Sequence, residues 1–493
     1  MKKFIIIPAV AAAIPLVGAA ATKVAPTNSA SKENEKPNII FILGDDLGMG
    51  DIGAFGQRDI KTPNIDRLVR EGMVFTRAYC GDAVSSPSRC VLMTGQHTGH
   101  SAIRGNLRNA TIRPEDITIP EAIKKNTDYV TGMTGRWHLG EEGSNQTPYD
   151  RGFDYVWGKL GNSFKSTMGV FVDGLWDKDG KHVPPEVYTT HGQEAVYENG
   201  KYYNLTPEEM AHRPINLDRM LTDKAKVYIE KNRNKNFFLY MAYCLPHAPM
   251  QYQDQTPVSP NSWPDTERAF ASMVQCLDKY VGEITDKVDQ LGIGKKTMII
   301  FTSDNGAHNE GGHSFHFFRS TGDFRGFKRD FYDGGFHTPF IVRWPGTVKA
   351  GSKSDHLMAF QDVMPTVCEL AGAPIPAGID GISFAPTLKG KPAEQKQHEY
   401  LYWEFNEHSD MSIKTPEYKQ AVVFGNWKLI KYVDDNRTEL YYLPDDVGET
   451  NDLAAKHPDL VAKGLKLMER AHVYNSNFPL LPSERPNGKT ANQ

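Results

Sequence analysis

The chain has 493 residues, of which 39% are hydrophobic and 24% charged, and its 56 Lys and Arg against 60 Asp and Glu give a formal net charge of −4. This composition is typical of a folded globular protein with about two to three domains, and it excludes disorder, collagen and a coiled coil as descriptions of the whole chain. Because there is no basic excess, we expect no nucleic-acid partner.

Five cysteines are scattered along the chain, an odd number with no closely spaced CxxC pair. A disulfide framework needs paired cysteines, and a structural zinc site needs ligands at short, regular spacings. The pattern therefore argues against both. The cysteines are Cys80, Cys90, Cys244, Cys276 and Cys368.

The first 21 residues have the pattern of a secretory signal peptide. Lys2 and Lys3 precede an apolar run from Phe4 to Gly18, and the small residues 19–21 suit cleavage. The run is shorter than the stretch of about 20 residues that spans a bilayer, and prolines interrupt it. We therefore expect export, no membrane span in the mature form, and a disordered lead-in over residues 22–36.

Three apolar runs mark the expected centre of the fold, over residues 38–43, 237–242 and 298–301. Runs without polar alternation are typical of strands that are buried on both faces. Between the second and third runs, apolar residues recur at spacings of three or four over residues 270–291, which predicts a helix. The order strand, helix, strand favours an α/β fold with a parallel sheet covered by helices, in a large domain over residues 37–390.

The pattern changes beyond Pro392, where shorter strands are expected. Gly425-Asn426 predicts a tight turn between two of them, and a helix is expected from Pro458 to His472. We therefore predict a smaller C-terminal α+β domain over residues 391–493 with a short antiparallel sheet. Its expected strands cover residues 400–403, 421–424 and 427–432.

Acidic and amide side chains follow the first and third apolar runs, where each expected strand ends. Asp45 and Asp46 follow the first run, and Asp304 and Asn305 follow the third. Ligands of an open α/β sheet bind beyond the carboxyl ends of its strands, and acids gathered there would repel one another without a cation. Oxygen ligands of this kind favour Ca²⁺ or Mg²⁺. The alternative is that these residues cap a helix and form a turn.

A second site is indicated by the sequence Ser85-Ser86-Pro87-Ser88-Arg89. Pro87 suits the first turn of a helix, where backbone N–H groups and the helix dipole favour an anion. Arg89 lies four residues after Ser85 and therefore faces the same way. A hydroxyl and a guanidinium would then share one anion-binding corner, although a serine before a proline also serves as an ordinary helix cap.

The stretch from Ser85 to Gly95 closely resembles the signature of the type I, formylglycine-dependent sulfatases of the alkaline-phosphatase superfamily. In that signature Cys or Ser, any residue, Pro, Ser and Arg precede a short apolar run and Thr-Gly. Further motifs resembling those of bacterial carbohydrate sulfatases and arylsulfatases follow in family order along nearly all of the mature chain. They cover residues 38–48, 62–66, 135–140, 246–247, 304–306, 326–328, 343–346, 439–441 and 451–453.

The resemblance implies a large mixed, mostly parallel sheet between helices, and hydrolysis of sulfate esters. In this family the first residue of the signature is oxidised to formylglycine (3-oxoalanine), so that Ser85 is the expected precursor. A hydrated aldehyde has a second hydroxyl whose deprotonation expels sulfate, which a plain serine lacks. One Ca²⁺ per chain is implied, at positions that match the family's metal site. These are Asp45, Asp46, Ser85, Asp304 and Asn305.

Five further positions match catalytic or sulfate-binding positions of the family. By this resemblance Arg89 steadies the hydrated aldehyde, and His138 acts as the base when the sulfated form collapses. His247 is placed to protonate the departing alcohol, and Lys328 to bind sulfate. Arg136 stands where lysine is more usual, and we expect it to bind sulfate through its planar guanidinium.

The chain departs from the commonest family pattern at two other positions. His337 stands where arginine is usual, which we expect to affect packing or the substrate pocket. Ser85 replaces the more frequent cysteine, and the resemblance assigns its oxidation to an oxygen-independent radical maturation enzyme of some bacteria. We therefore expect a periplasmic or secreted bacterial protein; an engineered change of cysteine to serine is the alternative.

Polar residues near these motifs are the candidates for substrate contacts; Glu310 is among those in the long segment after Asn305, and the specific assignments are Arg104, His308 and Asp333. Such side chains suit sugar hydroxyls. We expect exo-acting removal of O-sulfate from a sulfated glycan, with galactose or N-acetylgalactosamine sulfate as the specific prediction.

Two other functions are open at this point. A phosphate monoester or diester hydrolase of the same superfamily would use unmodified Ser85 and a second metal, for which His308, His313 and His316 are available. A sulfated-glycan-binding protein with an inactive site would also fit the departures at Ser85 and Arg136.

Overall fold

A mixed sheet of ten strands forms the centre of the computed structural model, which describes residues 36–485 except 108–109, 142, 161–174, 177–181, 184–194, 205–216, 251–259 and 408–416. The central strand β1 (Asn38–Gly44) lies parallel to β10 (Phe237–Ala242) on one side and to β11 (Thr297–Ser303) on the other. β4 (Val130–Arg136) and β5 (Tyr155–Lys159) continue the parallel part beyond β10. The prediction of a mixed, mostly parallel sheet is confirmed.

Antiparallel pairs occur toward the two edges of this sheet. Beyond β11 the order is β12 (Phe340–Arg343), β2 (Met73–Phe75) and β13 (Ser352–Ser354), with β12 antiparallel to both of its neighbours. Beyond β5 lie the antiparallel strands β8 (Ala195–Glu198) and β9 (Lys201–Asn204). Two short pairs lie outside the sheet: β3 (Ala78–Tyr79) with β14 (Met358–Ala359), and β6 (Leu175–Trp176) with β7 (His182–Val183).

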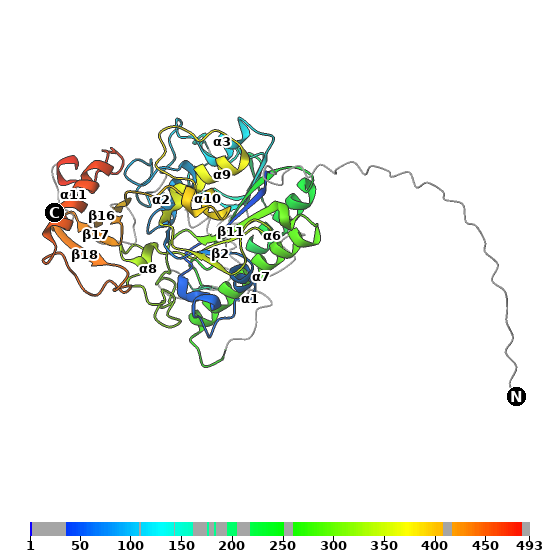
Figure 1. Cartoon of the computed structure of the whole chain (residues 1–493), viewed down its shortest axis with the longest axis horizontal. Coiled ribbons are helices and arrows are strands. Elements are labelled where there is room, and N and C mark those ends of the chain that lie inside the picture. Colours follow the sequence, from blue (N-terminus) through cyan, green and yellow to red (C-terminus); the bar gives the residue numbers. More distant parts are fainter. Residues whose placement is uncertain are drawn as a thin grey trace. The chain divides into compact units, whose positions relative to one another are not determined.

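Helices cover both faces of the sheet. Successive side chains of a strand point to opposite sides, and in β1 both sets are apolar, so each face packs against helices. Ile40 and Ile42 belong to one core, which also contains residues of α1 (Pro63–Glu71), α6 (Leu217–Asn232) and α7 (Asp265–Gln290) (Figure 1). Ile39 and Phe41 belong to a second core with α2 (Ser85–Thr94), α3 (Ile119–Lys124), α9 (Val363–Ala371) and α10 (Ala385–Leu388). Each of these buried side chains stabilises the fold by about 1.5–3 kcal/mol.

The helix predicted between the second and third apolar runs is α7, which begins five residues earlier than its apolar periodicity. Its first turn carries Asp265 and Glu267, whose negative charges are favourable beside the helix N-terminus. Because this turn has few apolar residues, the 3.6-residue pattern that predicted the helix starts only at Phe270.

The parallel strands bring their carboxyl ends to one level. In the register of the sheet Gly44 pairs with Ser303, Leu43 with Ala242, and Ala242 with Gly135. Gly135 has a φ of +109°, and a Cβ there would lie 1.9 Å from the carbonyl oxygen of Ala242, so only glycine fits. The residues that follow these strands therefore emerge side by side, including both acidic pairs of the predicted metal site.

The C-terminal part forms the predicted antiparallel sheet, with four strands in the order β15 (Leu401–Glu407), β16 (Glu417–Phe424), β17 (Trp427–Tyr432) and β18 (Arg437–Tyr442). Helix α11 (Pro458–Ala471) packs on it through a separate apolar core. The turn at Gly425-Asn426 joins β16 to β17, and Gly425 adopts a φ of +61°. The boundary at residue 390 stays a prediction.

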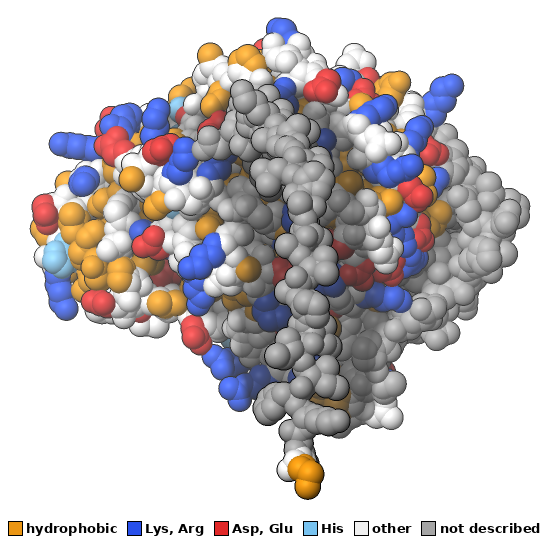
Figure 2. Space-filling model, turned by 45° about the vertical axis from the view of Figure 1, so that its right-hand side comes forward, with side chains coloured by type: hydrophobic (Ala, Val, Ile, Leu, Met, Phe, Trp, Pro, Cys, Tyr) orange, Lys and Arg blue, Asp and Glu red, His pale blue; other side chains and the backbone are white. Residues whose placement is uncertain are grey.

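The described surface carries the mixed charge that the composition predicts. On the face shown in Figure 2, Lys and Arg side chains lie among Asp and Glu side chains. Of the helices in the described ranges, none combines the length with the apolar composition that a bilayer span requires. The predicted signal peptide, residues 1–21, and the lead-in up to residue 35 lie outside the described residues.

A buried ion cluster joins the C-terminal sheet to α8 (Asp333–Phe336). The Lys428 ammonium of β17 lies 2.7 Å from Asp333, at the start of α8, and 2.9 Å from Glu449. All three side chains are buried, and the Tyr79 hydroxyl donates to Asp333 at 3.2 Å. Burial raises the pKa of Glu449 to about 7 although Lys428 opposes this. Lys428 therefore compensates both of these buried carboxyls.

Replacing Lys428 by methionine is expected to lower the free energy of unfolding by about 3–5 kcal/mol, because two buried acids lose their cation. Urea denaturation followed by tryptophan fluorescence measures this. Lys466→Met on the exposed side of α11 is the matched control and should change stability by less than about 0.5 kcal/mol. Equal stability of the two variants would contradict the assignment.

Candidate active site

Four oxygen-bearing side chains meet at the carboxyl edge of the sheet. Asp45 and Asp46 follow β1, Asp304 and Asn305 follow β11, and all four are fully buried. The Asn305 amide donates to Asp46 Oδ1 at 2.7 Å, and the backbone N–H of Asp46 donates to Asp304 Oδ1 at 3.2 Å. Asp46 has a φ of +67°, an uncommon conformation that turns the chain back over the strand end.

Ser85 lies beside this acid cluster, in the first turn of α2. Its Oγ is 3.1 Å from Asp45 Oδ1 and 3.4 Å from Asn305 Oδ1. A serine hydroxyl has one proton, so it can donate to only one of these two acceptors at a time. The structure thus brings together all five predicted metal ligands. The Ser85 hydroxyl lies near two acceptor oxygens but has a proton for only one of them.

Two arginines supply positive charge to the cluster. The Arg89 guanidinium donates to Asp304 Oδ2 at 2.7 and 3.0 Å and to Asp45 Oδ2 at 3.0 Å, and Arg136 also pairs with Asp45. Burial alone would raise the pKa of Asp45, but Arg136 and Arg89 outweigh it and hold that pKa below its usual range. Because its backbone carbonyl accepts from Arg89 at 2.8 Å, Arg136 is fixed at the end of β4.

The cluster fits a hard divalent cation. Burial raises the pKa of Asp304 to about 6, and Asp45 adds to this, despite two hydrogen bonds from Arg89. The neighbouring cations therefore compensate the charge of Asp304 only in part. Carboxylate, amide and hydroxyl oxygens from two strand ends and one helix are a donor set suited to Ca²⁺ or Mg²⁺.

His138 is the next of the predicted catalytic residues. It follows β4, is nearly fully buried, and has a φ of +64°. Its Nδ1 lies 3.2 Å from the Arg136 guanidinium, which can only donate, so the remaining proton of the neutral ring lies on Nε2. Burial, Arg136 and Arg89 lower its pKa well below the usual value. His138 is therefore neutral near neutral pH.

Lys328 and His247 lie close to Asp46 Oδ2, whereas Asn305 donates to Asp46 Oδ1. Lys328 Nζ donates to Asp46 Oδ2 at 2.8 Å, and His247 Nε2 lies 3.6 Å from the same oxygen. Although burial opposes it, Asp46 and Glu310 raise the pKa of Lys328, which stays protonated. The His247 side chain is 19% exposed, whereas Asp46 is fully buried, so this side of the cluster opens toward solvent.

Two of the three predicted substrate contacts, Arg104 and Asp333, lie away from the acid cluster. Arg104 is buried and pairs with Glu404 at 2.6 Å, and Asp333 belongs to the ion cluster with Lys428. No contact within the described ranges joins either residue to the acid cluster. His308 is buried next to the site. Their roles as substrate ligands stay predictions.

The histidines considered for a second metal do not point to one position. His308 Nε2 faces the backbone carbonyl of Pro246 at 3.1 Å, and its Nδ1 accepts from a backbone N–H. His313 faces Glu267 at 2.6 Å and stacks on Phe270 with 3.7 Å between ring centroids. His316 is exposed. The ligand atoms of His308, Asp46 and Glu310 do lie within 4.8 Å of one another, but Lys328 already pairs with both of these acids.

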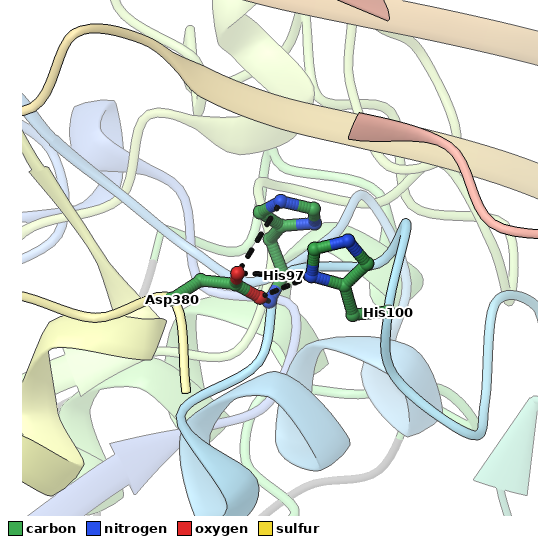
Figure 3. Close-up of side chains that lie close together, drawn as sticks. All are labelled: His97, His100 and Asp380. Carbon is green, nitrogen blue, oxygen red and sulfur yellow. Dashed lines mark hydrogen bonds and ion pairs between the residues drawn. The ribbon is translucent and has the colours of Figure 1, made fainter. Parts of the chain in front are cut away.

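His97, His100 and Asp380 form another group of possible metal ligands (Figure 3). The His97 backbone N–H donates to Asp380 at 2.9 Å, and His100 Nδ1 lies at the same distance from that carboxylate. The two rings stack at 27° with centroids 4.3 Å apart, so their lone pairs do not converge on one ion. The group follows the C-terminal end of α2, about 15 Å along the helix from Ser85. It anchors the turn after α2.

Sequence reasoning named Glu310 among the polar residues beside the site without assigning it a role, and it missed Arg329. Arg329 follows Lys328 directly, and Glu310 lies in the polar segment after Asn305. Glu310 contacts both Lys328 and Arg329. Their proximity to predicted site residues in the sequence was the available signal, but a charged loop residue is usually solvated.

Known protein families match most of this chain. Residues 37–373 match the family described as Sulfatase, and residues 322–470 match the family described as N-sulphoglucosamine sulphohydrolase, C-terminal. The two matches together include the acid cluster, Ser85 and most of the C-terminal sheet.

Individual relatives are similar over most of their length. The N-acetylgalactosamine-6-O-sulfatase of Bacteroides thetaiotaomicron is 28% identical over 487 residues, which cover 89% of this chain and 93% of the relative. The N-acetylgalactosamine-6-sulfatase of Mus musculus is 33% identical over 379 residues, which cover 72% and 67%. The solved structure of Ps i-CgsB in complex with k-i-k-neocarrahexaose is similar with a TM-score of 0.72 and 27% identity, over 88% of this chain and 92% of that chain.

Removing one acid of the cluster is expected to abolish binding of one Ca²⁺ per chain. In Asp304→Asn, titration calorimetry should detect no binding, and the rise in melting temperature of several degrees that saturating Ca²⁺ gives the wild type should disappear. Asp380→Asn, which alters the His97 group, is the matched control and should bind like the wild type. Loss of binding in the control with retention in Asp304→Asn would place the metal elsewhere.

Proposed function

Since the chain belongs to the sulfatase family and is a sulfuric ester hydrolase, we propose that it removes O-sulfate from sulfated glycans by an exo-acting reaction centred on residue 85. One observation carries this proposal: the Ser85 hydroxyl lies at the N-terminal turn of α2 and against the acid cluster, 3.1 Å from Asp45. The helix N-terminus and the nearby cations favour an anionic sulfate group at this position.

The chemistry depends on two groups that the chain would acquire. Formylglycine derived from Ser85 would supply a hydrated aldehyde as the nucleophile, and Ca²⁺ held by the acid cluster would polarise a sulfate oxygen. Arg89 orients the cluster by pairing with Asp45 and Asp304 at once. These pairs hold the ligand oxygens in place before any substrate arrives, which is the preorganisation that charge stabilisation requires.

The remaining residues divide into those that bind sulfate and those that move protons. Arg136 and Lys328 are cationic and lie on either side of the acid cluster, paired with Asp45 and Asp46 respectively. His138 is neutral, as a general base must be. His247 lies on the open side of the site, where an alcohol would depart, and is suited to donate a proton to it.

Sulfate at O6 of N-acetylgalactosamine or galactose is the substrate that we propose. The two relatives from Bacteroides thetaiotaomicron and Mus musculus are named as sulfatases for the 6-position of N-acetylgalactosamine, and Ps i-CgsB was solved in complex with k-i-k-neocarrahexaose. The chain itself supports this proposal through three partly exposed polar side chains beside the acid cluster, those of His247, Glu310 and Arg329.

We also propose that Ser85 is native and is oxidised by a maturation enzyme, and that the N-terminal 21 residues direct export to the bacterial periplasm or beyond. The five cysteines are all buried, and none occupies the position of the nucleophile. Cys90 lies within α2, and burial raises its pKa to about 12, which makes it a poor substitute.

Coexpression with an oxygen-independent radical maturation enzyme is expected to remove two hydrogens from the peptide that contains Ser85, because the alcohol becomes an aldehyde. Mass spectrometry of that peptide and sulfate release from an aryl sulfate are the measurements. Ser85→Ala should show neither change. Protein that cleaves sulfate esters with an unaltered Ser85 would overturn the maturation proposal.

A panel of singly sulfated monosaccharides tests the substrate. Galactose 6-sulfate and N-acetylgalactosamine 6-sulfate are expected to be hydrolysed with kcat/KM at least about tenfold above their 4-sulfated isomers, since each misplaced polar contact costs about 1–3 kcal/mol. Ion chromatography of released sulfate measures this. Release only from steroid or simple aryl sulfates would overturn the carbohydrate proposal, and binding of sulfated sugars without release by matured protein would indicate an inactive binding protein.

A further inference from the structure

A chain of alternating charges leads from the acid cluster to the surface. Asp46, which is fully buried, pairs with Lys328 at 2.8 Å; Lys328 pairs with Glu310 at 3.2 Å; Glu310 pairs with Arg329 at 2.6 Å. Exposure of the side chains rises in the same direction, from 3% for Lys328 to 24% for Glu310 and 22% for Arg329. Glu310 and Arg329 therefore lie where the rest of a substrate would extend from its sulfate.

The backbone is shaped to bring two neighbouring residues to one carboxylate. Side chains of consecutive residues in an extended chain point to opposite sides, yet Lys328 and Arg329 both contact Glu310. Arg329 has a φ of +77°, a left-handed conformation that is uncommon for a residue other than glycine. Its backbone N–H donates to the carbonyl of Ala83 at 2.9 Å, two residues before Ser85.

Glu310 is fixed by the loop that carries His247. His308 accepts from the Glu310 backbone N–H at 3.1 Å, so its proton lies on Nε2 and is directed at the carbonyl of Pro246, also at 3.1 Å. Burial lowers the pKa of His308 to about 3, which keeps the ring neutral in this arrangement. The two hydrogen bonds of His308 thereby tie the backbone of Glu310 to the loop that carries the proposed proton donor His247.

We propose that Glu310 and Arg329 form a specificity subsite that binds the neutral hydroxyl at C4, the free hydroxyl nearest to a sulfate at O6 of a pyranose. The proposal rests on the glycan sulfatase function proposed above. A hydroxyl both donates and accepts, and it therefore matches a carboxylate acceptor beside a guanidinium donor.

Charge balance selects a hydroxyl over a second anion. An unpaired arginine on the exposed side of the site would attract a further sulfate or a uronate carboxylate. Here Glu310 compensates Arg329, and the four charges from Asp46 to Arg329 sum to zero. A second negative group beside the reacting sulfate would meet the Glu310 carboxylate, whereas a hydroxyl would replace water in hydrogen bonds to both side chains.

Arg329→Gln tests the subsite with the full-length matured enzyme. The measured quantity is kcat/KM for three substrates: the preferred sugar 6-sulfate, its 4-deoxy analogue, and 4-nitrophenyl sulfate. The ratio of sugar sulfate to 4-nitrophenyl sulfate should fall at least about tenfold in this variant, the expected loss of a hydrogen bond to a charged group. The wild type should discriminate against the deoxy analogue by a similar factor, and the variant should not. Arg319→Gln removes an arginine that is 74% exposed and serves as the matched control with both ratios retained.

Glu310→Gln is the second variant. Removing its charge should raise the relative activity toward a 6-sulfated sugar with a second sulfate at O4 at least about threefold, because repulsion is lost. Equal loss on sugar and aryl sulfates in Arg329→Gln, or full discrimination against the deoxy analogue in that variant, would overturn the subsite while leaving glycan sulfatase activity established by the wild type. A wild type that releases sulfate from no sugar overturns the glycan function and this subsite with it.

Discussion

The structure depends on the concentration of negative charge at the carboxyl edge of its parallel strands. Asp45, Asp46 and Asp304 are buried at the ends of β1 and β11, where the register of the sheet makes their approach unavoidable. Isolated buried carboxylates are costly, so the surrounding chain must provide cations. Arg89 and Lys328 do so from opposite sides, and each is itself buried. Their placement in turn fixes α2 and the segment that contains Lys328 against the sheet.

Sequence reasoning was most successful where the physical signal is local. Continuous apolar runs predicted β1, β10 and β11, because strands buried on both faces cannot alternate with polar residues. The acids that follow two of these strands predicted where a site would form, and the structure brings Ser85 to them across 40 residues of sequence. Short strands such as β2 and β13 gave no comparable signal, since three residues show no clear periodicity.

The partners of buried charges could not be predicted from sequence. Arg104 pairs with Glu404, and Asp333 pairs with Lys428, at separations of 300 and 95 residues. Each pair links a residue outside the C-terminal sheet to a strand of that sheet, Glu404 in β15 and Lys428 in β17, and no local pattern in the sequence indicates either partner. Glu310 is closer in sequence to its partners Lys328 and Arg329 than the residues of those two pairs are to each other. Its pairing nevertheless depends on the left-handed conformation of Arg329, which no residue pattern predicts.

The central claim is that the acid cluster and residue 85 together hold one divalent cation at the reacting centre. A crystal structure of the matured protein grown with Ca²⁺, with anomalous scattering to identify the metal, tests it most directly. The account predicts a single ion with oxygen ligands at about 2.3–2.6 Å from the side chains of Asp45, Asp46, Asp304 and Asn305 and from the oxidised residue 85. Two metals bridged by histidine ligands, or an ion held by His97 and Asp380 with none at the acid cluster, would contradict it.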